Sequence, residues 1–318
     1  MKLTDIVIVP AALVAVLFSI TYCFFRLVFY SKNRKIKVDE SKIELPRGKV
    51  YEPYYEVMSS WILAARKLRH EDVSIVSRDG LKLTGKFYEF ASGAPIEIMF
   101  HGYRGSAERD MSGGVQRCFS VGRSALVVEQ RCSNTSEGHL ITFGVREYLD
   151  CIDWVDFVIE HFGKDVKIIL TGISMGASTV LMAAGRTLPE NVIGILADCG
   201  FTSAKEIMYH VMGQLKLPPR ICYPILKIGA KLFGKFDLEE YSAIEAMKHC
   251  KVPVIFYHGE EDDFVPCSMS RENFEACAAR KHLVTIPGAG HGLSYAKDPQ
   301  RYLQELRDFF GPENSYPQ

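Results

Sequence analysis

Short apolar runs alternate with longer amphipathic segments over most of the chain. The runs lack the every-second-residue alternation of a strand with one solvated face, so they predict strands buried on both faces of a parallel sheet. The six runs are 96–100, 125–129, 166–171, 192–197, 252–257 and 282–286. The segments between them predict helices near 108–121, 143–161, 174–188 and 299–310. This order of strands and helices predicts one α/β domain, with a mostly parallel central sheet and helices on both faces.

Three further segments surround this array. Residues 73–76 and 81–88 alternate on either side of an Asp79-Gly80 turn, which predicts an antiparallel hairpin. The aromatic-rich stretch that begins at Tyr51 predicts a helix packed on the main fold. The interval 203–250 is too long for a simple crossover. It predicts two or three apolar helices that form a small cap over the carboxyl edge of the sheet.

The N-terminal apolar run has the length of a membrane span. Residues 6–25 carry no charge, and a helix of twenty residues is about 30 Å long, which matches a bilayer core. A transmembrane anchor is therefore predicted over 1–30, a basic juxtamembrane linker over 31–50, and the globular domain over 51–318. A cleaved signal peptide is disfavoured, because the leader is not clearly positive and no A-x-A site follows. A buried helix of the globular domain is the other alternative.

Charge predicts the orientation of this anchor. Basic residues after the run outnumber the single lysine before it, and the positive-inside rule then places the large domain in the cytoplasm. We therefore expect a single-pass membrane protein whose N-terminal helix contacts lipid. The basic residues that follow the helix are Arg26, Lys32, Arg34, Lys35 and Lys37.

Composition excludes several classes of protein. The 318 residues are 47% apolar, which is enough for a sizeable core, and 38 basic residues balance 38 acidic ones. A neutral chain lacks the basic patch expected of a nucleic-acid-binding protein. Nine scattered cysteines without a C-x-x-C pair predict reduced, mostly buried thiols and no metal cluster. No phosphate-binding glycine loop or dinucleotide fingerprint is present, so we expect no cofactor. The oligomeric state stays open.

One motif directly follows a predicted strand. Residues 172–176 read Gly-Ile-Ser-Met-Gly, which matches G-x-S-x-G between the strand VKIILT and the small-residue helix ASTVLMAAG. The bare pattern is weak, but a strand before it and a helix after it are the context that a nucleophile elbow requires. Side chains at Gly172 or Gly176 would clash in so tight a turn. Ser174 is therefore the candidate nucleophile.

A serine nucleophile needs a base, and the base needs a residue that orients it. The candidates are Asp262, in the loop HGEEDDFVP after the fifth apolar run, and His291, in the loop PGAGHG after the sixth. The order Ser, Asp, His is the chain order of an α/β-hydrolase triad. His291 would take the Ser174 proton, and Asp262 would orient His291. Three other carboxylates in the same loop compete with Asp262: Glu260, Glu261 and Asp263.

The tetrahedral intermediate of such a reaction needs an oxyanion hole. The backbone N–H of Met175, which follows the nucleophile, is one candidate donor. The loop HGYRG after the first apolar run supplies the other, the backbone N–H of Tyr103, with His101 and Gly102 shaping the loop. Arg104 in this loop is interpreted as a solvated charge in preference to a substrate contact.

With these motifs the chain resembles the α/β-hydrolase superfamily. The segments HGYRGS, GISMGAS, HGEEDDFVP and GAGHG carry the resemblance, which extends from about residue 73 to 310, and ITFGVREYLD at 141–150 adds to it. Within the superfamily the chain is most similar to bacterial serine hydrolases near the serine aminopeptidase and prolyl-oligopeptidase-like esterase groups. Several members of those groups carry one N-terminal membrane helix.

The chain departs from these groups at one loop. Where relatives commonly show D-x-R-G-x-G-x-S, residues 129–136 read EQRCSNTS, which keeps Arg131 and Ser136 but changes the aspartate and both glycines. No triad position is affected. The departure concerns the shape of a loop beside the site.

The sequence thus predicts a membrane-anchored serine hydrolase acting on an ester or thioester with a modest acyl chain, which the apolar cap from 207 to 232 would accommodate. A peptidase or aminopeptidase is the first alternative, because the same triad attacks amides. Glu260, Glu261 or Asp263 would then bind the substrate amine. A catalytically silent scaffold that tethers a partner to the membrane is the second alternative.

Overall fold

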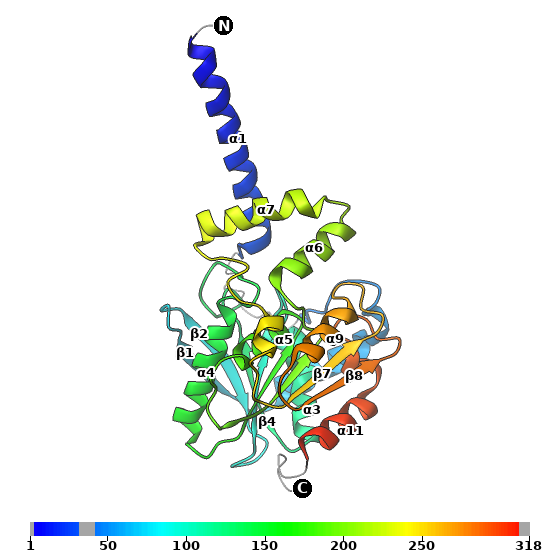
Figure 1. Ribbon diagram of the computed structural model, residues 1–318. Helices are drawn as coiled ribbons and strands as arrows, with labels where there is room; N and C mark the ends of the chain where they lie inside the picture. The colour runs from blue at the N-terminus through cyan, green and yellow to red at the C-terminus, as the bar shows by residue number, and fades with distance from the viewer. Residues whose placement is uncertain (1–2, 32–41, 312–318) are drawn as a thin grey trace.

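The computed structural model describes residues 3–31 and 42–311, and side chains are described from residue 12 onward. Half of the predicted juxtamembrane linker, including Lys32, Arg34, Lys35 and Lys37, lies outside the described residues. A long N-terminal helix projects from a rounded body that contains the sheet (Figure 1).

The body is built on one eight-stranded sheet with the order β1-β2-β4-β3-β5-β6-β7-β8. The first two strands form the expected hairpin, β2 runs antiparallel to β4, and all the other neighbours are parallel. The strands are β1 (Glu71–Val76), β2 (Lys82–Tyr88), β3 (Ile96–Phe100), β4 (Ser124–Glu129), β5 (Ile168–Ile173), β6 (Val192–Asp198), β7 (Val254–Gly259) and β8 (Lys281–Ile286). Strands β3 to β7 are buried almost throughout, which is why their sequences read as continuous apolar runs.

Helices cover both faces of the sheet, as the sequence predicts. On one face, α4 (Glu147–Phe162), α5 (Met175–Ala184), α8 (Ala243–Met247) and α9 (Cys267–Ala276) contribute to the largest apolar cluster. On the other face lie α2 (Tyr55–Lys67), which follows the short 3-10 turn Glu52–Tyr54, and α3 (Ala107–Ser120), α10 (Ser294–Lys297) and α11 (Pro299–Phe310). The result is an α/β-hydrolase architecture.

Two of the predicted helices have different ends from those expected. The helix expected from 143 begins at Glu147, because Phe143 and Gly144 have positive φ angles and the Glu147 carboxylate accepts hydrogen bonds from Thr142 and Gly144. The helix expected over 174–188 is α5, which begins after Ser174 and ends at Ala184. Helix α9, which follows the predicted acid loop, was not predicted.

A cap lies over the carboxyl edge of the sheet. It consists of α6 (Ala204–Gln214), α7 (Pro219–Gly229) and a π-helical turn, Ala230–Gly234, that continues α7 directly. Helix α8 falls inside the range expected for the cap, but its buried side chains Ala243 and Met247 belong to the main core.

The N-terminal helix α1 (Leu3–Phe29) is docked on this cap. Its window Ala12–Phe29 has a mean hydropathy of 2.1 and is long and apolar enough to cross a membrane. Most of that window is exposed, but Phe25 and Phe29 at its end are buried in the cap cluster. Figure 1 shows α7 lying across the base of α1, on the side of the body opposite α11.

Candidate active site

The predicted nucleophile lies in a strained turn between β5 and α5. Ser174 has φ 55° and ψ −120°, outside the conformations that L-residues prefer. A Cβ atom on Gly172 would overlap the Gly176 carbonyl, and one on Gly176 would overlap the Phe100 carbonyl of β3. Both glycines are therefore required by close backbone approach, as predicted, and the turn places Ser174 Oγ at the carboxyl edge of the sheet.

The structure brings the three candidate triad residues together from three strand ends. His291 Nε2 lies 2.9 Å from Ser174 Oγ, and His291 Nδ1 lies 2.7 Å from Asp262 Oδ2. A carboxylate only accepts, so Nδ1 carries the proton and Nε2 accepts from the Ser174 hydroxyl. The Phe264 ring meets the His291 ring edge-on with centroids 5.0 Å apart, which helps to hold the imidazole in place.

Asp262 is held by its own loop and by a second histidine. The N–H groups of Phe264 and Val265 donate to Asp262 Oδ1 at 3.0 and 2.8 Å. His258 Nε2 lies 3.2 Å from Asp262 Oδ2 and 2.8 Å from the Val265 carbonyl oxygen. Burial by itself raises the pKa of the Asp262 carboxyl, but the hydrogen bonds from His258 and His291 outweigh it and hold the pKa well below its ordinary value. The carboxylate is therefore ionised at neutral pH.

The role of His258 was not predicted. Its Nε2 faces the Val265 carbonyl oxygen and the Asp262 carboxylate, which only accept, so Nε2 carries a proton, and its Nδ1 contacts Ser270 Oγ at 2.7 Å. The only sequence signal for this role is its position at the end of β7, four residues before Asp262.

The three competing carboxylates occupy other places. Glu260 accepts from the Thr285 hydroxyl on β8 at 2.6 Å, Glu261 is exposed, and the exposed Asp263 uses its main-chain carbonyl to accept from Gln214 of the cap. Among the described residues, Asp262 is the carboxylate in hydrogen-bond contact with His291.

The two segments that carry the predicted oxyanion donors lie next to the nucleophile. Met175 is the first residue of α5, so its N–H has no acceptor within the helix. The loop after β3 passes close to the serine, and a Cβ on Gly102 would lie 3.8 Å from Ser174 Oγ. The Gly102 N–H is already bonded to Asp110 Oδ2 at 3.1 Å, so the Tyr103 N–H stays the candidate donor of this loop. His101 shapes the loop as predicted, since its Nδ1 contacts the Gly102 carbonyl at 2.8 Å.

The side chains of this oxyanion loop bind the end of α1. Tyr103 Oη donates to the Val28 carbonyl at 2.6 Å, and Arg104 donates to the Leu27 carbonyl at 2.6 Å. Arg104 is exposed, as expected of a solvated charge, but its guanidinium also caps carbonyls at a helix C-terminus that lack intrahelical donors, a role that was not predicted. The N-terminal helix is thus tied to the candidate catalytic loop.

The loop 129–136, where the chain departs from the family pattern, holds two non-glycine residues in left-handed backbone conformations. Cys132 and Asn134 stand where relatives have glycine, and both have positive φ angles, 67° and 39°. The loop thus keeps left-handed conformations of the kind that glycine favours, and Asn tolerates this region well. Arg131 binds Asp150 and Asp79, and the Ser136 hydroxyl donates to the Glu129 carbonyl at 2.6 Å. These two shared residues hold the loop in place.

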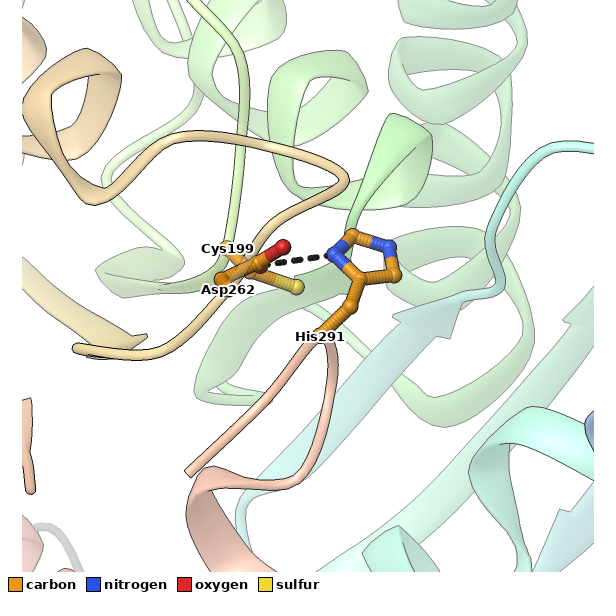
Figure 2. A group of neighbouring side chains, drawn as sticks. All are labelled: Cys199, Asp262 and His291. Carbon is orange, nitrogen blue, oxygen red and sulfur yellow. Dashed lines mark hydrogen bonds and ion pairs between the residues drawn. The ribbon is translucent and has the colours of Figure 1, made fainter. Parts of the chain in front are cut away.

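One buried thiol lies beside the triad. Figure 2 shows Cys199 next to Asp262, with Asp262 bonded to His291. One ligand atom from each of these residues lies within 4.8 Å of the others, a donor set that could in principle hold a metal ion. Burial raises the pKa of the Cys199 thiol well above its ordinary value, however, and Asp262 and His291 already bond each other. The arrangement fits a triad with a protonated thiol behind it. All nine cysteines are free thiols, and seven are buried.

The cap closes over the site. Ser174 is only 7% exposed, and Met175, Tyr103 and Phe143 pack in one apolar cluster with Met208 and Leu226 of the cap. A hollow of about 580 Å³ lies beside the oxyanion loop. Three arginines, one acidic residue and three other residues line it: Arg47, Arg104, Arg109, Glu44, Ile43, Leu45 and Tyr103.

The bond between Tyr103 and α1 can be tested by Tyr103→Phe. We expect kcat to fall about fivefold with little change in KM, because one hydrogen bond contributes about 1 kcal/mol and an oxyanion donor acts mainly in the transition state. Steady-state kinetics on a soluble ester measure both constants. Tyr55→Phe removes a similar bond, from a tyrosine hydroxyl to the Pro46 carbonyl at 2.9 Å, and serves as the control. A raised KM at unchanged kcat would contradict the positioning role.

Known proteins resemble this chain over most of its length. A model of the prolyl oligopeptidase family matches residues 142–313, which include Ser174, Asp262 and His291. The protein YqkD of Bacillus subtilis (strain 168) is 27% identical over 195 residues, which are 61% of this chain and 64% of YqkD, so the match spans just under two thirds of that relative.

Solved structures of esterases share the fold. The Pyrococcus furiosus esterase Pf2001 superposes with a TM-score of 0.63 at 21% identity, over 84% of this chain and 95% of the esterase. The esterase RhEst1 from Rhodococcus sp. ECU1013 superposes with a TM-score of 0.56 at 19% identity, over 75% of this chain and 98% of RhEst1.

Proposed function

This chain belongs to the prolyl oligopeptidase family within the α/β-hydrolase superfamily, and we propose that it is a membrane-anchored serine hydrolase that cleaves an ester or thioester. The proposal depends on one observation above all. His291 lies within hydrogen-bond distance of both Ser174 Oγ and Asp262 Oδ2.

The reaction follows from this geometry. Ser174 Oγ attacks the substrate carbonyl and passes its proton to His291 Nε2, while Asp262 stabilises the imidazolium. The N–H groups of Met175 and Tyr103 donate to the oxyanion that forms. Collapse of the intermediate breaks the ester bond, and His291 returns the proton to the leaving alcohol or thiol. Water then attacks the acyl-enzyme by the same route and releases the acid.

We propose that α1 is a permanent anchor that places the catalytic domain at the cytoplasmic face of a membrane. A signal peptide is removed from the mature protein, but Phe25 and Phe29 are almost fully buried in the cap cluster. Cleavage after α1 would strip these aromatic rings from the core and the carbonyl acceptors from Tyr103 and Arg104. These contacts support an anchor over a cleaved leader.

The charges near the site favour an ester over an aminopeptidase substrate. An aminopeptidase needs an acidic group for the substrate amine, but Glu260 is bonded to Thr285 on β8. Three arginines and Glu44 line the hollow beside the oxyanion loop, and with Arg109 paired to Asp110 the charge there is still net positive, which disfavours a cation.

The substrate class can be measured with the full-length protein in detergent. We expect hydrolysis of p-nitrophenyl esters and acyl thioesters, with amino-acid p-nitroanilides cleaved at least about a hundredfold more slowly, because Glu260 is engaged by Thr285 and the hollow beside the oxyanion loop is net positive. A fluorophosphonate probe measures the active fraction of the same preparation. Faster cleavage of the anilides would support a peptidase. A folded protein that neither reacts with the probe nor cleaves any substrate would support a scaffold.

A further inference from the structure

The outward face of the cap carries an apolar stripe. Side chains spaced three or four residues apart are exposed from just before α7, along α7, and into the turn after it: Leu217, Ile221, Pro224, Ile228 and Leu232. Ile221, Ile228 and Leu232 each expose more than half of their surface, while Cys222 and Leu226 on the opposite side of the helix are buried. A contiguous exposed stripe of this kind marks a surface that binds something apolar.

The stripe is continuous with the membrane helix. Thirteen of the seventeen large hydrophobic side chains that are exposed among the described residues lie on α1 or between residues 215 and 232. Phe233 packs against Phe18, Tyr22 and Phe25 of α1, with ring centroids 5.0 to 5.5 Å apart. Helix α7 therefore crosses α1 at the end of its apolar run, where a spanning helix leaves the bilayer core (Figure 1).

Charge along the same segment fits an anionic lipid surface. Residues 215–235 contain five basic residues and no acidic one: Lys216, Arg220, Lys227, Lys231 and Lys235. Lys227 and Lys231 are ion-paired with Glu239 and Asp237, so the charge that faces lipid comes mainly from the other three. A helix with an apolar face and flanking basic residues lies in the interface plane, with its apolar side among the acyl chains and its basic side chains near lipid phosphates.

We propose that the outward face of α7 lies in the same leaflet that α1 enters, and that the substrate is an amphipathic ester taken directly from that leaflet. This rests on the proposed function of Ser174. The cap cluster contacts Met175, the residue after the nucleophile, on one side and carries the lipid-facing helix on the other. An acyl chain that enters beneath α7 therefore reaches Ser174 through apolar side chains.

The position of α7 is tested by fluorescence of the full-length protein in vesicles of phosphatidylcholine and phosphatidylglycerol. An environment-sensitive probe is attached at Ile228→Cys or, as the control, at Gln304→Cys on exposed α11, at the opposite end of the body. Both variants also carry Cys23→Ser and Cys267→Ser, because the other seven cysteines are buried. We expect doxyl-labelled lipids to quench the probe at 228 at least about threefold more than the probe at 304. Equal quenching, or a blue-shifted probe at 228 that lipids do not quench, would overturn the proposal.

The substrate source is tested with Ile221→Glu/Ile228→Glu, two changes at exposed positions outside the triad and the oxyanion loop. We expect hydrolysis of a long-chain ester embedded in vesicles to fall about tenfold, with hydrolysis of a soluble short-chain ester unchanged. Ile221→Ser/Ile228→Ser removes the same side chains without adding charge, and its hydrolysis of the embedded ester should fall less. Equal losses on both esters would overturn the proposed route. Failure of wild type to cleave the soluble ester would instead refute the proposed hydrolase, and the quenching experiment would still test the membrane face.

Discussion

Replacing Ser174 with alanine is expected to lower kcat on a soluble ester by about a millionfold and to abolish fluorophosphonate labelling. The triad works as a unit, so removing its nucleophile costs about as much as removing all three residues. Alanine keeps the Cβ atom and the backbone of the turn, so the fold should persist. Single-turnover kinetics and gel fluorescence measure the two effects.

Ser178 provides the matched control for this experiment. It lies four residues later on α5, is fully buried, and its hydroxyl donates to the Phe201 carbonyl at 2.9 Å and accepts from the Phe201 N–H at 2.8 Å. Ser178→Ala should lower the free energy of unfolding by about 1 to 3 kcal/mol, because it leaves buried polar groups unpaired, yet it should still react with the probe. Labelling that persists in Ser174→Ala would show that another residue is the nucleophile.

The sheet could be predicted from the sequence, and so could the meeting of Ser174, Asp262 and His291 at its edge, because the signals for both are local. Strands buried on both faces show as apolar runs, and the glycines around Ser174 follow from a turn that leaves no room for Cβ atoms. Asp262 and His291 come next along the chain, each in a loop that follows a later strand, so both loops lie at the same edge of the sheet as Ser174. Each of these inferences needs only a short window of sequence and the rule that parallel strands end on one edge.

Features that depend on distant pairs could not be predicted. Glu97 lies within a strand that reads as apolar, yet it is fully buried and paired with Arg117 and with Arg123, the latter at 2.6 Å. Burial by itself raises the pKa of Glu97, but the two guanidinium groups hold the pKa below its ordinary value. The arginines come from α3 and the segment after it, so only the packing of α3 on the sheet reveals the pairing.

The bond between the oxyanion loop and α1 could not be predicted for the same reason. Tyr103 and Val28 are 75 residues apart, and a membrane helix is expected to be independent of the domain it anchors. The structure joins the two, since the last turns of α1 are part of the cap core and supply carbonyl acceptors to Tyr103 and Arg104. Helix α1 is thus also a structural element of the candidate site.

Asp262→Asn is expected to lower kcat by about ten-thousandfold while leaving the geometry of the site intact. The carboxylate accepts from His291 Nδ1 and so keeps Nε2 free to take the Ser174 proton. An asparagine amide can donate to Nδ1 instead, which places the imidazole proton on Nε2, where it blocks the base; the same change in a serine protease triad has about this effect. Asp263→Asn is the matched control and should keep full activity. A large loss in Asp263→Asn, with Asp262→Asn active, would reassign the acid.

The same substitution has a signature in stability against pH. The folded-state pKa of Asp262 is held below its ordinary value, so the ionised carboxylate stabilises the native protein above the unfolded-state pKa of about 3.9, and this contribution is lost as the pH falls toward the folded value. Asp262→Asn has no such ionisation. Wild type should therefore exceed Asp262→Asn in free energy of unfolding at neutral pH, and the difference should shrink below about pH 4. Urea denaturation at pH 7 and at pH 3.5 measures this difference in the free energy of unfolding. A difference that is the same at both pH values would mean that the charge of Asp262 is not stabilised by His258 and His291.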